Sequence, residues 1–384
     1  MYWKRNLSDP IKEASRHFPV LLATGPRQTG KTELLRHTFP HHRYVTLDAL
    51  DVRQRAERDP RAFFVDSAPG LLIDEIQEAP GLLPYVKEFV DRNKTPGQVV
   101  LTGSHQFHLM QGVTESLSGR VAIFQLLPFS WPEIAPHTQP DLANLLLRGM
   151  YPQLQTTPDL NLDLWFSSYI NTYLERDLRS QIAIRDLRSF EALLQLLAAR
   201  IGQELNMHKL AAEVGVKSPT IKEWISALEA AFVIYLLPPY FQNFGKRVVR
   251  SPKIYFVDTG LACHLLKIRS PETLISGPMA GPLFENFIIQ EFRKAHLNQA
   301  RQAPLYFWRS HDGLEVDLLV DQGEHLQAIE IKLTHTVTLD HVRNLLRFQD
   351  LSDKKVTLLA VTPSERPALS DPLQHKHWTK ITGG

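Results

Sequence analysis

Residues 19–32 read PVLLATGPRQTGKT, an apolar stretch that runs into a glycine-containing turn. The turn, from Gly25 to Thr32, fits the pattern GxxxxGK[ST] without a mismatch, and the helical segment TELLRHTF follows. A buried strand, a turn of this kind and a helix, in this order, predict a phosphate-binding loop. Glycine lets the backbone curl so that its N–H groups face a phosphate, and the helix N-terminus adds the positive end of its dipole.

This loop is predicted to bind ATP together with Mg²⁺. Lys31 would neutralise the β- and γ-phosphates and assist their transfer, while the Thr32 hydroxyl would be a ligand of Mg²⁺. The predicted nucleotide-binding residues of the loop are Gly25, Pro26, Arg27, Gln28, Thr29, Gly30, Lys31 and Thr32.

A second apolar stretch, residues 71–75 (LLIDE), ends in two adjacent carboxylates. Successive side chains at the end of a strand point in different directions, so one acid can hold a metal while its neighbour orients water. Asp74 is therefore predicted to bind Mg²⁺, and Glu75 is predicted to polarise the attacking water as the catalytic base.

The β-branched stretch RYVTL, residues 43–47, lies between these two segments in the sequence. P-loop ATPases with an additional strand insert one between the lysine strand and the acid strand, and RYVTL is interpreted as that strand. The same pattern predicts a polar residue at the tip of the next strand, residues 98–103. Ser104, or alternatively Thr102, is the predicted sensor of the γ-phosphate or of the attacking water.

Arg120 ends the segment SLSGR, which precedes a fifth apolar strand at residues 121–126. A planar guanidinium stabilises charge spread over phosphoryl oxygens, so Arg120 is predicted to be an arginine finger that reaches the nucleotide of a neighbouring subunit. This role would require a homo-oligomer. The alternative is an ordinary arginine of the surface or of a helix end.

The 384-residue length favours two or three domains. A formal net charge of +2 means that any affinity for nucleic acid must come from a local patch. Cys263 is the single cysteine, which excludes a disulfide within one chain and favours a reducing compartment. The N-terminus lacks the apolar segment of a signal peptide, and no stretch approaches the roughly 20 apolar residues of a membrane span. We therefore expect a cytoplasmic protein without a membrane partner.

Residues 205–229 have the spacing of a helix-turn-helix, with Gly215 at the turn. A two-stranded ribbon with a basic wing is predicted to follow, which would make a winged helix. The predicted DNA-binding residues are Lys217, Ser218, Thr220 and Lys222 at the start of the second helix and Lys246, Arg247, Arg250 and Lys253 in the wing. Winged helices also serve as protein-packing modules, so a protein partner is the alternative.

The last third returns to alternating strands and helices, with charged residues at related positions. Glu285 falls on a predicted helix, Asp317 on a strand, and Glu330 and Lys332 on the next strand. This order resembles the PD-(D/E)XK nuclease core, in which Asp317 and Glu330 would hold Mg²⁺, Lys332 would steady the hydroxide or phosphate, and Glu285 would assist. The alternative is a set of salt-bridged charges, or a retained fold that has lost activity.

Several motifs together resemble the bacterial and archaeal AAA+-type ATPases that carry a DUF4143 region at the C-terminus. The motifs are GPRQTGKT, LLIDEIQ, VLTGSHQF, SLSGRV with LLPFSWPE, TYLERDL, YFVDTGL and EVDLLV. The resemblance implies an ATPase module, a winged helix and a nuclease-like tail, with the DUF4143 region at about residues 165–340. It implies no particular cellular role.

The predicted fold class is α/β: a P-loop ATPase domain with a parallel sheet, then a helical and winged-helix domain, and a C-terminal mixed α/β nuclease-like domain. The predicted boundaries are 1–136 for the ATPase domain, 137–200 for a helical linker, 201–270 for the winged helix and 271–384 for the nuclease-like domain.

The favoured function is that of an ATP-hydrolysing AAA+-type protein associated with DNA, with a Mg²⁺-dependent nuclease-like domain. One alternative is an ATP-driven regulatory switch that binds a protein partner and has no nuclease activity. A kinase is a third reading, weakened because no lid or acceptor-binding motif is evident. Clustering of the four charged residues of the C-terminal third around a metal would favour the first function over the switch.

Overall fold

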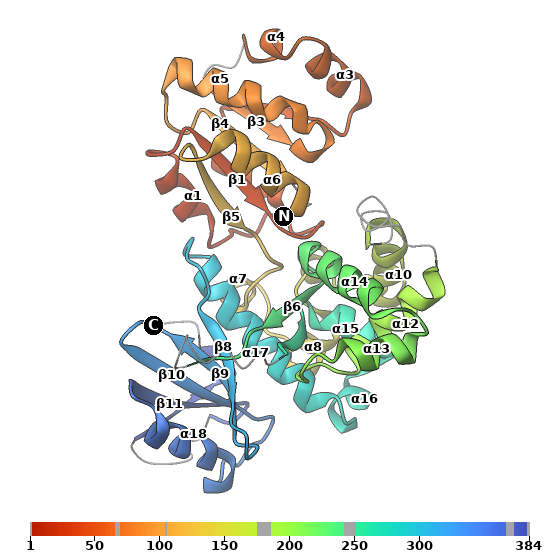
Figure 1. Cartoon of the computed structure of the whole chain (residues 1–384), viewed down its shortest axis with the longest axis vertical. Helices are drawn as coiled ribbons and strands as arrows, with labels where there is room; N and C mark the ends of the chain where they lie inside the picture. Colours follow the sequence, from red (N-terminus) through yellow and green to blue (C-terminus); the bar gives the residue numbers. More distant parts are fainter. Residues whose placement is uncertain are drawn as a thin grey trace.

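The computed structural model describes residues 2–65, 70–103, 106–174, 186–241, 251–365 and 372–381. Figure 1 shows an N-terminal α/β part at the top and, below it, a second part in which a helical region lies beside a C-terminal sheet. Across these ranges, no helix is both long enough and apolar enough to cross a membrane.

The N-terminal part is built on a five-stranded parallel sheet, as predicted. Its strands are β1 (Val20–Thr24), β2 (Arg43–Thr46), β3 (Leu71–Asp74), β4 (Val99–Gly103) and β5 (Val121–Gln125), in the order β2-β3-β4-β1-β5. The strands β1, β3 and β4 are buried throughout, because helices cover both faces of the sheet.

One prediction about this sheet is wrong. The strand between β1 and β3 in space is β4, which pairs with both, whereas β2 lies at the edge beside β3. A strand inserted between two others must be buried on both faces. The sequence VVLTG of β4 meets this condition, while Arg43 and Tyr44 of β2 are exposed.

Alternation along β1 divides the core of the sheet into two layers. Leu21 and Ala23 pack on the side of α1 (Ser8–Ala14) and α2 (Lys31–Thr38). Val20 and Leu22 pack on the opposite side, which is covered by the remaining helices of this part. These are α3 (Leu50–Arg58), α4 (Pro60–Val65), α5 (Leu83–Asn93) and α6 (Gln106–Leu117), with the 3-10 turns Ile76–Glu78 and Pro80–Leu82.

The helical region follows β5 and surrounds a short two-stranded ribbon. It contains α7 (Trp131–Ile134), α8 (Leu142–Arg148), α9 (Pro152–Thr156), α10 (Leu162–Tyr169) with a π-helical extension (Ile170–Leu174), α12 (Leu187–Ala198), α13 (Met207–Val214), α14 (Ser218–Ala230), β6 (Ile234–Leu237), β7 (Lys253–Phe256), α15 (Thr259–Leu265), α16 (Pro271–Ser276) and α17 (Ala280–Leu297). The helices α13 and α14 meet at Gly215, whose φ of 79° ends α13. Apolar residues of both helices, including Leu210 and Trp224, are buried.

The C-terminal sheet is mixed, as predicted. Its strands are β8 (Leu305–Arg309), β9 (Glu315–Asp321), β10 (His325–Ile331), β11 (Lys355–Thr362) and β12 (Leu373–His377), in the order β12-β11-β10-β9-β8. Antiparallel pairs join β8, β9 and β10, and parallel pairs join β10, β11 and β12. The helix α18 (Leu339–Leu351) packs on this sheet, and the 3-10 turn Trp378–Lys380 follows β12.

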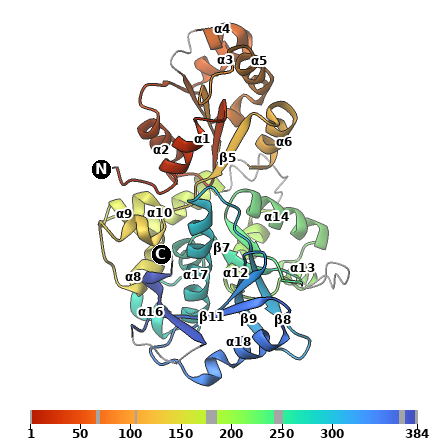
Figure 2. The same cartoon turned by 90° about the vertical axis from the view of Figure 1, so that its left-hand side faces the viewer.

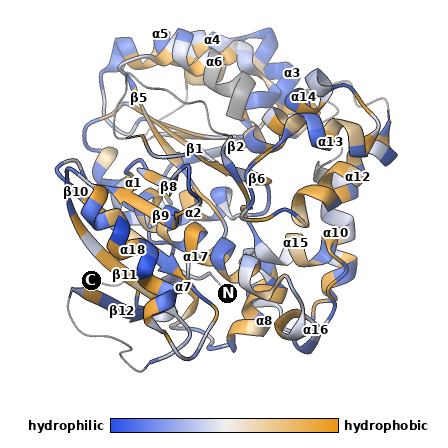
Figure 3. Cartoon of the chain, turned by 60° about the horizontal axis from the view of Figure 1, so that its bottom comes forward, coloured by the Kyte–Doolittle hydropathy of each residue, from blue (hydrophilic) through white to orange (hydrophobic). Residues whose placement is uncertain are grey.

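A single hydrophobic cluster joins the helical region to the C-terminal sheet. It runs from Trp3 and Phe129 through α17 to Trp378, so apolar packing is continuous across the boundaries proposed near residues 200 and 270. Figure 2 shows α17 at the centre of this second part, between the helices and the sheet. Figure 3 shows hydrophobic residues gathered where the helices and strands face one another.

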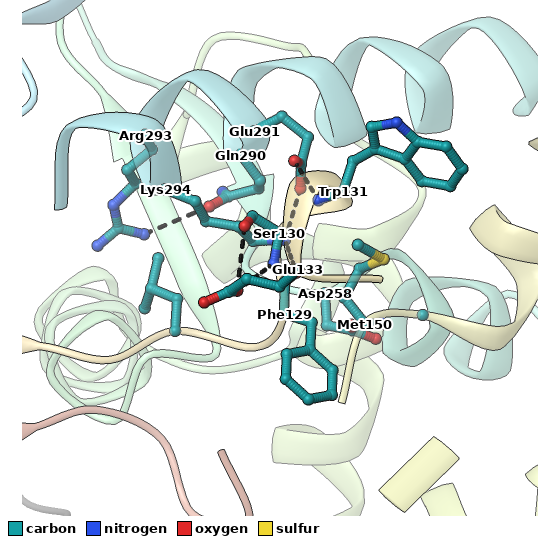
Figure 4. A network of polar contacts seen from close by, with 12 residues as sticks. Phe129, Ser130, Trp131, Glu133, Met150, Asp258, Gln290, Glu291, Arg293 and Lys294 are labelled. Atoms are coloured by element: carbon teal, nitrogen blue, oxygen red, sulfur yellow. Dashed lines mark hydrogen bonds and ion pairs between the residues drawn. The ribbon is translucent and has the colours of Figure 1, made fainter. Parts of the chain in front are cut away.

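The connection between β5 and α8 is tied to α17 by buried polar contacts, drawn in Figure 4. The Glu291 carboxylate accepts from the backbone N–H of Trp131 at 2.7 Å and from Lys294 Nζ at 2.9 Å. Lys294 also donates to the carbonyl of Phe129 at 2.8 Å. These contacts hold the chain that follows β5 against the central helix of the second part.

Candidate nucleotide site

The backbone of the predicted phosphate loop takes conformations that favour glycine at both ends. Gly25 has a φ of 142°, and a Cβ atom there would lie 2.2 Å from the backbone oxygen of Leu126. Gly30 has a φ of 84° and immediately precedes α2. The loop therefore curls tightly between the end of β1 and the start of α2, as its sequence predicts.

Lys31, the first residue of α2, points into this curl. Its side chain is buried, and Nζ donates to the carbonyl of Gly25 at 3.0 Å and to the carbonyl of Pro26 at 2.8 Å. The loop therefore wraps around a positive charge. This arrangement, with the N–H groups of the first turn of α2 beside it, suits a phosphate.

Asp74, at the end of β3, faces the start of α2. The Thr32 hydroxyl lies 2.9 Å from Asp74 Oδ1 and 3.0 Å from Oδ2. The structure thus brings together the two residues predicted to hold Mg²⁺. A hydroxyl and a carboxylate are hard oxygen donors that fit this ion, and nucleotide phosphates and water would complete its six ligands.

Glu75 leaves β3 in a different direction from Asp74. Its φ of 56° is left-handed, and its backbone N–H donates to the Thr102 hydroxyl at 3.0 Å. The side chain of Gln77 donates to Glu75 Oε2 at 2.5 Å. A left-handed glutamate is strained by roughly 1–3 kcal/mol, and such strain is concentrated at functional sites.

Thr102 does not have the position expected of a sensor. It is fully buried, donates to Asp74 Oδ1 at 2.5 Å and accepts the backbone N–H of Glu75. Its hydroxyl is therefore engaged by the Asp74 carboxylate and by the Glu75 backbone, because β4 lies directly beside β3, and its sensor role stays a prediction. Ser104, the other predicted sensor, falls outside the described residues.

Arg120 is held by its own chain. Its guanidinium donates to both carboxylate oxygens of Asp91, at 2.6 Å from Nε and 3.0 Å from Nη2. This contact lowers the pKa of the exposed Asp91 carboxyl and raises the pKa of Arg120. A finger role in a neighbouring subunit would require this ion pair to open, and it stays a prediction.

Arg5 is a loop-supporting residue that the sequence did not reveal. Its buried guanidinium donates to the carbonyls of Thr29 and Leu127, both at 2.7 Å, and pairs with Glu133 at 3.0 Å. The Glu133 side chain is fully buried, and the charge of Arg5 helps to lower its pKa against the opposing effect of burial. A lone arginine near the N-terminus gives no indication of such contacts.

A cavity of about 330 Å³ borders the loop on the side of Thr29 and Gly30. Tyr2 forms one wall and stacks on His37 of α2, with ring centroids 3.8 Å apart. The lining residues are Tyr2, Trp3, Arg5, Thr29, Gly30, Glu33, His37, Phe129, Pro152 and Thr156. The N-terminal segment and the helical region therefore both contribute to the surroundings of the loop.

The predicted nuclease-like residues of the C-terminal sheet also lie together. Lys332 Nζ is 2.7 Å from Glu330 Oε1 and 3.2 Å from Asp317 Oδ2. Asp317 also accepts the backbone N–H of Ile331 at 2.9 Å. Glu285, on α17, is close enough that the charge of Asp317 contributes to raising its pKa.

Lys253, predicted to belong to a basic DNA-binding wing, is instead buried in this second cluster. Its ammonium pairs with Glu315 and lies 3.7 Å from Glu285 Oε1. The hydroxyl of Tyr255 also donates to Glu285, at 2.5 Å. The prediction is wrong for Lys253 because the start of β7 turns it toward the carboxylates of α17 and β9, away from solvent.

Burial and mutual repulsion favour the protonated form of two acids of this cluster, Glu285 and Glu330. Burial, followed by the charge of Asp317, raises the pKa of Glu285 to about 7 and that of Glu330 to about 8. Glu330 Oε2 is buried without a hydrogen-bond partner. Among the described residues, no group of three or more His, Cys, Asp or Glu side chains could hold a metal ion. In this cluster Lys253 pairs with Glu315, and Lys332 pairs with Glu330.

The predicted DNA-contacting residues of the helix pair lie at the start of α14. Lys217 and Lys222 are exposed, whereas Ser218 and Thr220 are partly buried. Ser218 Oγ lies 3.0 Å from His208 Nδ1. Lys246, Arg247 and Arg250 fall outside the described residues.

Models of known families match three consecutive segments of the chain. An AAA domain matches residues 17–135, a domain of unknown function (DUF8612) matches residues 139–272, and another (DUF4143) matches residues 280–376. The DUF4143 match begins and ends later than the range that the sequence motifs implied.

Relatives that match most of this chain occur in bacteria. The uncharacterized protein Rv2008c of Mycobacterium tuberculosis is 32% identical over 340 residues, which cover 88% of this chain and 75% of the relative. An uncharacterized protein of Haemophilus influenzae is 23% identical over 295 residues, which cover 73% of this chain and 69% of that protein.

Two solved structures have a similar arrangement over part of the chain. The Walker-type ATPase Paby2304 of Pyrococcus abyssi has a TM-score of 0.45 and 15% identity, covering 67% of this chain and 94% of its own. AMPPCP-bound DnaA from Aquifex aeolicus has a TM-score of 0.31 and 14% identity, covering 58% and 86%.

Proposed function

Because this chain belongs to the family of AAA+-type P-loop ATPases that carry a C-terminal DUF4143 region, we propose that it binds ATP with Mg²⁺ and hydrolyses it. The observation that carries the proposal is the arrangement around Lys31. The glycine-curled loop surrounds its ammonium, and Thr32 and Asp74 are within hydrogen-bond distance of each other. A positive charge beside a pair of hard oxygen donors suits a metal-bound triphosphate.

Each residue of the site would have a separate role in ATP hydrolysis. Lys31 and the N–H groups at the start of α2 hold the phosphates, while Thr32 and Asp74 hold Mg²⁺, which supplies neutralising charge to the phosphoryl oxygens. Glu75 orients the attacking water and accepts its proton. The divergence of Glu75 from Asp74 at the end of β3 lets the two acids serve these separate purposes.

The cavity beside Thr29 and Gly30 is the proposed site of the nucleoside. Its position next to the loop and its aromatic wall, Tyr2 stacked on His37, suit a planar base. Phe129 and Pro152 add apolar surface from the helical region.

The test compares the purified parent with Glu75→Gln and Lys31→Ala, using fluorescent ATP for binding and phosphate release for turnover. Glu75→Gln should bind Mg²⁺-ATP normally and lose roughly a hundredfold or more in turnover, because the base is gone. Lys31→Ala should lose binding. Glu78→Gln is the matched control, since Glu78 pairs with Arg53 at 2.7 Å, and it should hydrolyse ATP normally. A parent that ignores ATP, or unchanged turnover in Glu75→Gln, would contradict the proposal.

The intersubunit role of Arg120 has its own test. Arg120→Ala should lose turnover yet keep ATP binding, and the parent should form an oligomer when nucleotide is bound. Unchanged turnover would show that the ion pair with Asp91 is the whole role of this arginine.

Association with DNA is supported by the exposed lysines at the start of α14, where a recognition helix would meet phosphates. The variant Lys217→Ala/Lys222→Ala should bind duplex DNA more weakly, with a salt slope reduced by about two. Lys12→Ala, an exposed change on α1, is the control. Equal affinity and slope in all three proteins would contradict a DNA contact here.

The second candidate is an ATP-driven switch that binds a protein partner and cleaves nothing. The pairing of the C-terminal carboxylates with Lys253 and Lys332 favours it over a nuclease. A Mg²⁺-dependent cleavage assay decides between them. Cleavage by the parent that disappears in Asp317→Ala supports the nuclease, while no cleavage by either protein supports the switch.

A further inference from the structure

Tyr44, on the edge strand β2, reaches the metal-binding side of the nucleotide site. In the parallel register of β2 and β3, Tyr44 pairs with Leu72 and Thr46 with Asp74. Alternate residues share one face of a sheet, so Tyr44 lies on the same face as the Asp74 side chain. Its hydroxyl donates to Asp74 Oδ2 at 2.9 Å.

Asp74 is thereby held from both neighbouring strands. Thr102, on β4, donates to Oδ1 at 2.5 Å, while Tyr44, on β2, donates to Oδ2. Thr32 lies within 3.0 Å of both oxygens. These contacts fix the rotation of a nearly buried carboxylate.

The contact from Thr32 is the one that a metal would change. A hydroxyl that becomes a ligand of Mg²⁺ offers its oxygen to the ion and no longer serves Asp74 in the same way. The contacts from Tyr44 and Thr102 involve no predicted metal ligand other than Asp74 itself. They can therefore persist in the loaded site.

We propose that Tyr44 is a positioning residue for Mg²⁺: its hydroxyl holds Asp74 from the edge of the sheet and keeps the carboxylate oriented when Thr32 turns to the metal. The inference rests on the proposed ATP site. Mg²⁺ demands near-ideal octahedral geometry, so its binding is sensitive to the orientation of each oxygen around it. Groups that orient a metal ligand typically change metal affinity by about 10- to 100-fold when they are removed.

The surroundings of Tyr44 suit this role. The guanidinium of Arg36 lies 4.9 Å from the centre of its ring, and both residues line a cavity of about 570 Å³ beside α2. An ordinary phenol is protonated at neutral pH and can therefore donate a hydrogen bond to a carboxylate.

The test is Tyr44→Phe, which keeps the ring and removes only the hydroxyl. The Mg²⁺ concentration for half-maximal ATP hydrolysis should rise about tenfold, the low end of the range for such groups because the ring is partly exposed. Binding of fluorescent ATP in EDTA should be unchanged, and turnover should return to within about twofold of the parent at saturating Mg²⁺. A merely structural loss would not recover with metal.

Arg36→Gln is the matched control, because it removes the contact with the ring and leaves the hydroxyl in place. It should keep the Mg²⁺ dependence of the parent. An unchanged Mg²⁺ dependence in Tyr44→Phe would overturn the role of Tyr44 and leave the ATP site standing. A loss of turnover that saturating Mg²⁺ does not restore would overturn it as well. A parent that binds no nucleotide would overturn both proposals.

Discussion

At the scale of single residues, hydroxyl groups organise the acids of the nucleotide site. Thr102 joins Asp74 and Glu75 by donating to the first and accepting the backbone N–H of the second. The hydrogen bond to the Asp74 carboxylate is charge-assisted and therefore stronger than one between neutral groups. One side chain on β4 therefore sets the relative placement of the predicted metal ligand and the predicted base.

Thr102→Val should destabilise the protein by about 1–3 kcal/mol, because it preserves the shape of the side chain while removing the buried hydrogen bond to Asp74 and the acceptor of the Glu75 N–H. Urea denaturation measures the loss. The control Thr95→Val, at an exposed position, should stay within about 0.5 kcal/mol of the parent. Equal stability of the two variants would contradict this role for Thr102.

Glu330 should make stability depend on pH. Burial and the charge of Asp317 raise its pKa to about 8 in the folded protein, compared with an ordinary value of 4.5. Between these values the folded state keeps a proton that the unfolded state releases, so this contribution to stability falls as pH rises from about 4.5 to about 8, with a slope of at most about 1.4 kcal/mol per pH unit.

Glu330→Gln removes this titration. Denaturation of the parent and of Glu330→Gln between pH 5 and pH 9 should show the parent losing stability relative to the variant as pH rises. A constant difference, or one of opposite sign, would show that Glu330 is ionised in the folded protein.

At the scale of elements, the loop between β1 and α2 depends on its two glycines for different reasons. At Gly25 a side chain would collide with the backbone of Leu126, beyond the end of β5. At Gly30 no atom lies within 4 Å of the added carbon, so only the positive φ disfavours another residue. The first glycine serves packing against the sheet, and the second serves the turn into α2.

Gly25→Ala should therefore be more damaging than Gly30→Ala. We expect a loss of about 3 kcal/mol for the first, because backbone must move, and about 1 kcal/mol for the second. Urea denaturation of both variants without nucleotide checks the order. A smaller loss for Gly25→Ala would mean that the loop relaxes away from β5.

At the scale of the whole molecule, buried ion pairs connect the ATPase part to the rest of the chain. Arg5 joins the phosphate loop at Thr29 to Glu133 at the start of the helical region. Beyond it, the pair of Glu291 and Lys294 fixes the same connection to α17, as Figure 4 shows. A change at the nucleotide loop therefore has a short polar route to the central helix of the second part.

Arg5→Met should destabilise the protein by about 3–5 kcal/mol, because it leaves the buried Glu133 carboxylate without its cation. It should also weaken ATP binding, since the carbonyl of Thr29 loses its donor. Thermal unfolding and nucleotide titration measure the two effects. The double variant Arg5→Met/Glu133→Gln should lose less stability than the sum of the single variants, and additive losses would contradict a direct pair.

The sequence by itself determined the strand, loop and helix around Lys31, the acid strand that ends at Asp74, and the helix pair around Gly215. These features depend on residues close together in the chain, where hydrophobic alternation, glycine and helix periodicity act locally. The positions of most strands in both sheets followed for the same reason.

Only the tertiary structure decided which strand separates β1 from β3. It alone revealed the contacts of Arg5 and Tyr44 and the burial of Lys253. Tyr44 meets Asp74 across 30 residues of sequence, and Arg5 meets Glu133 across 128. Such contacts depend on the order of strands and on the packing of distant elements, which no local pattern encodes. The physical reason is that the local sequence around a polar side chain does not show whether that side chain faces solvent or a buried partner.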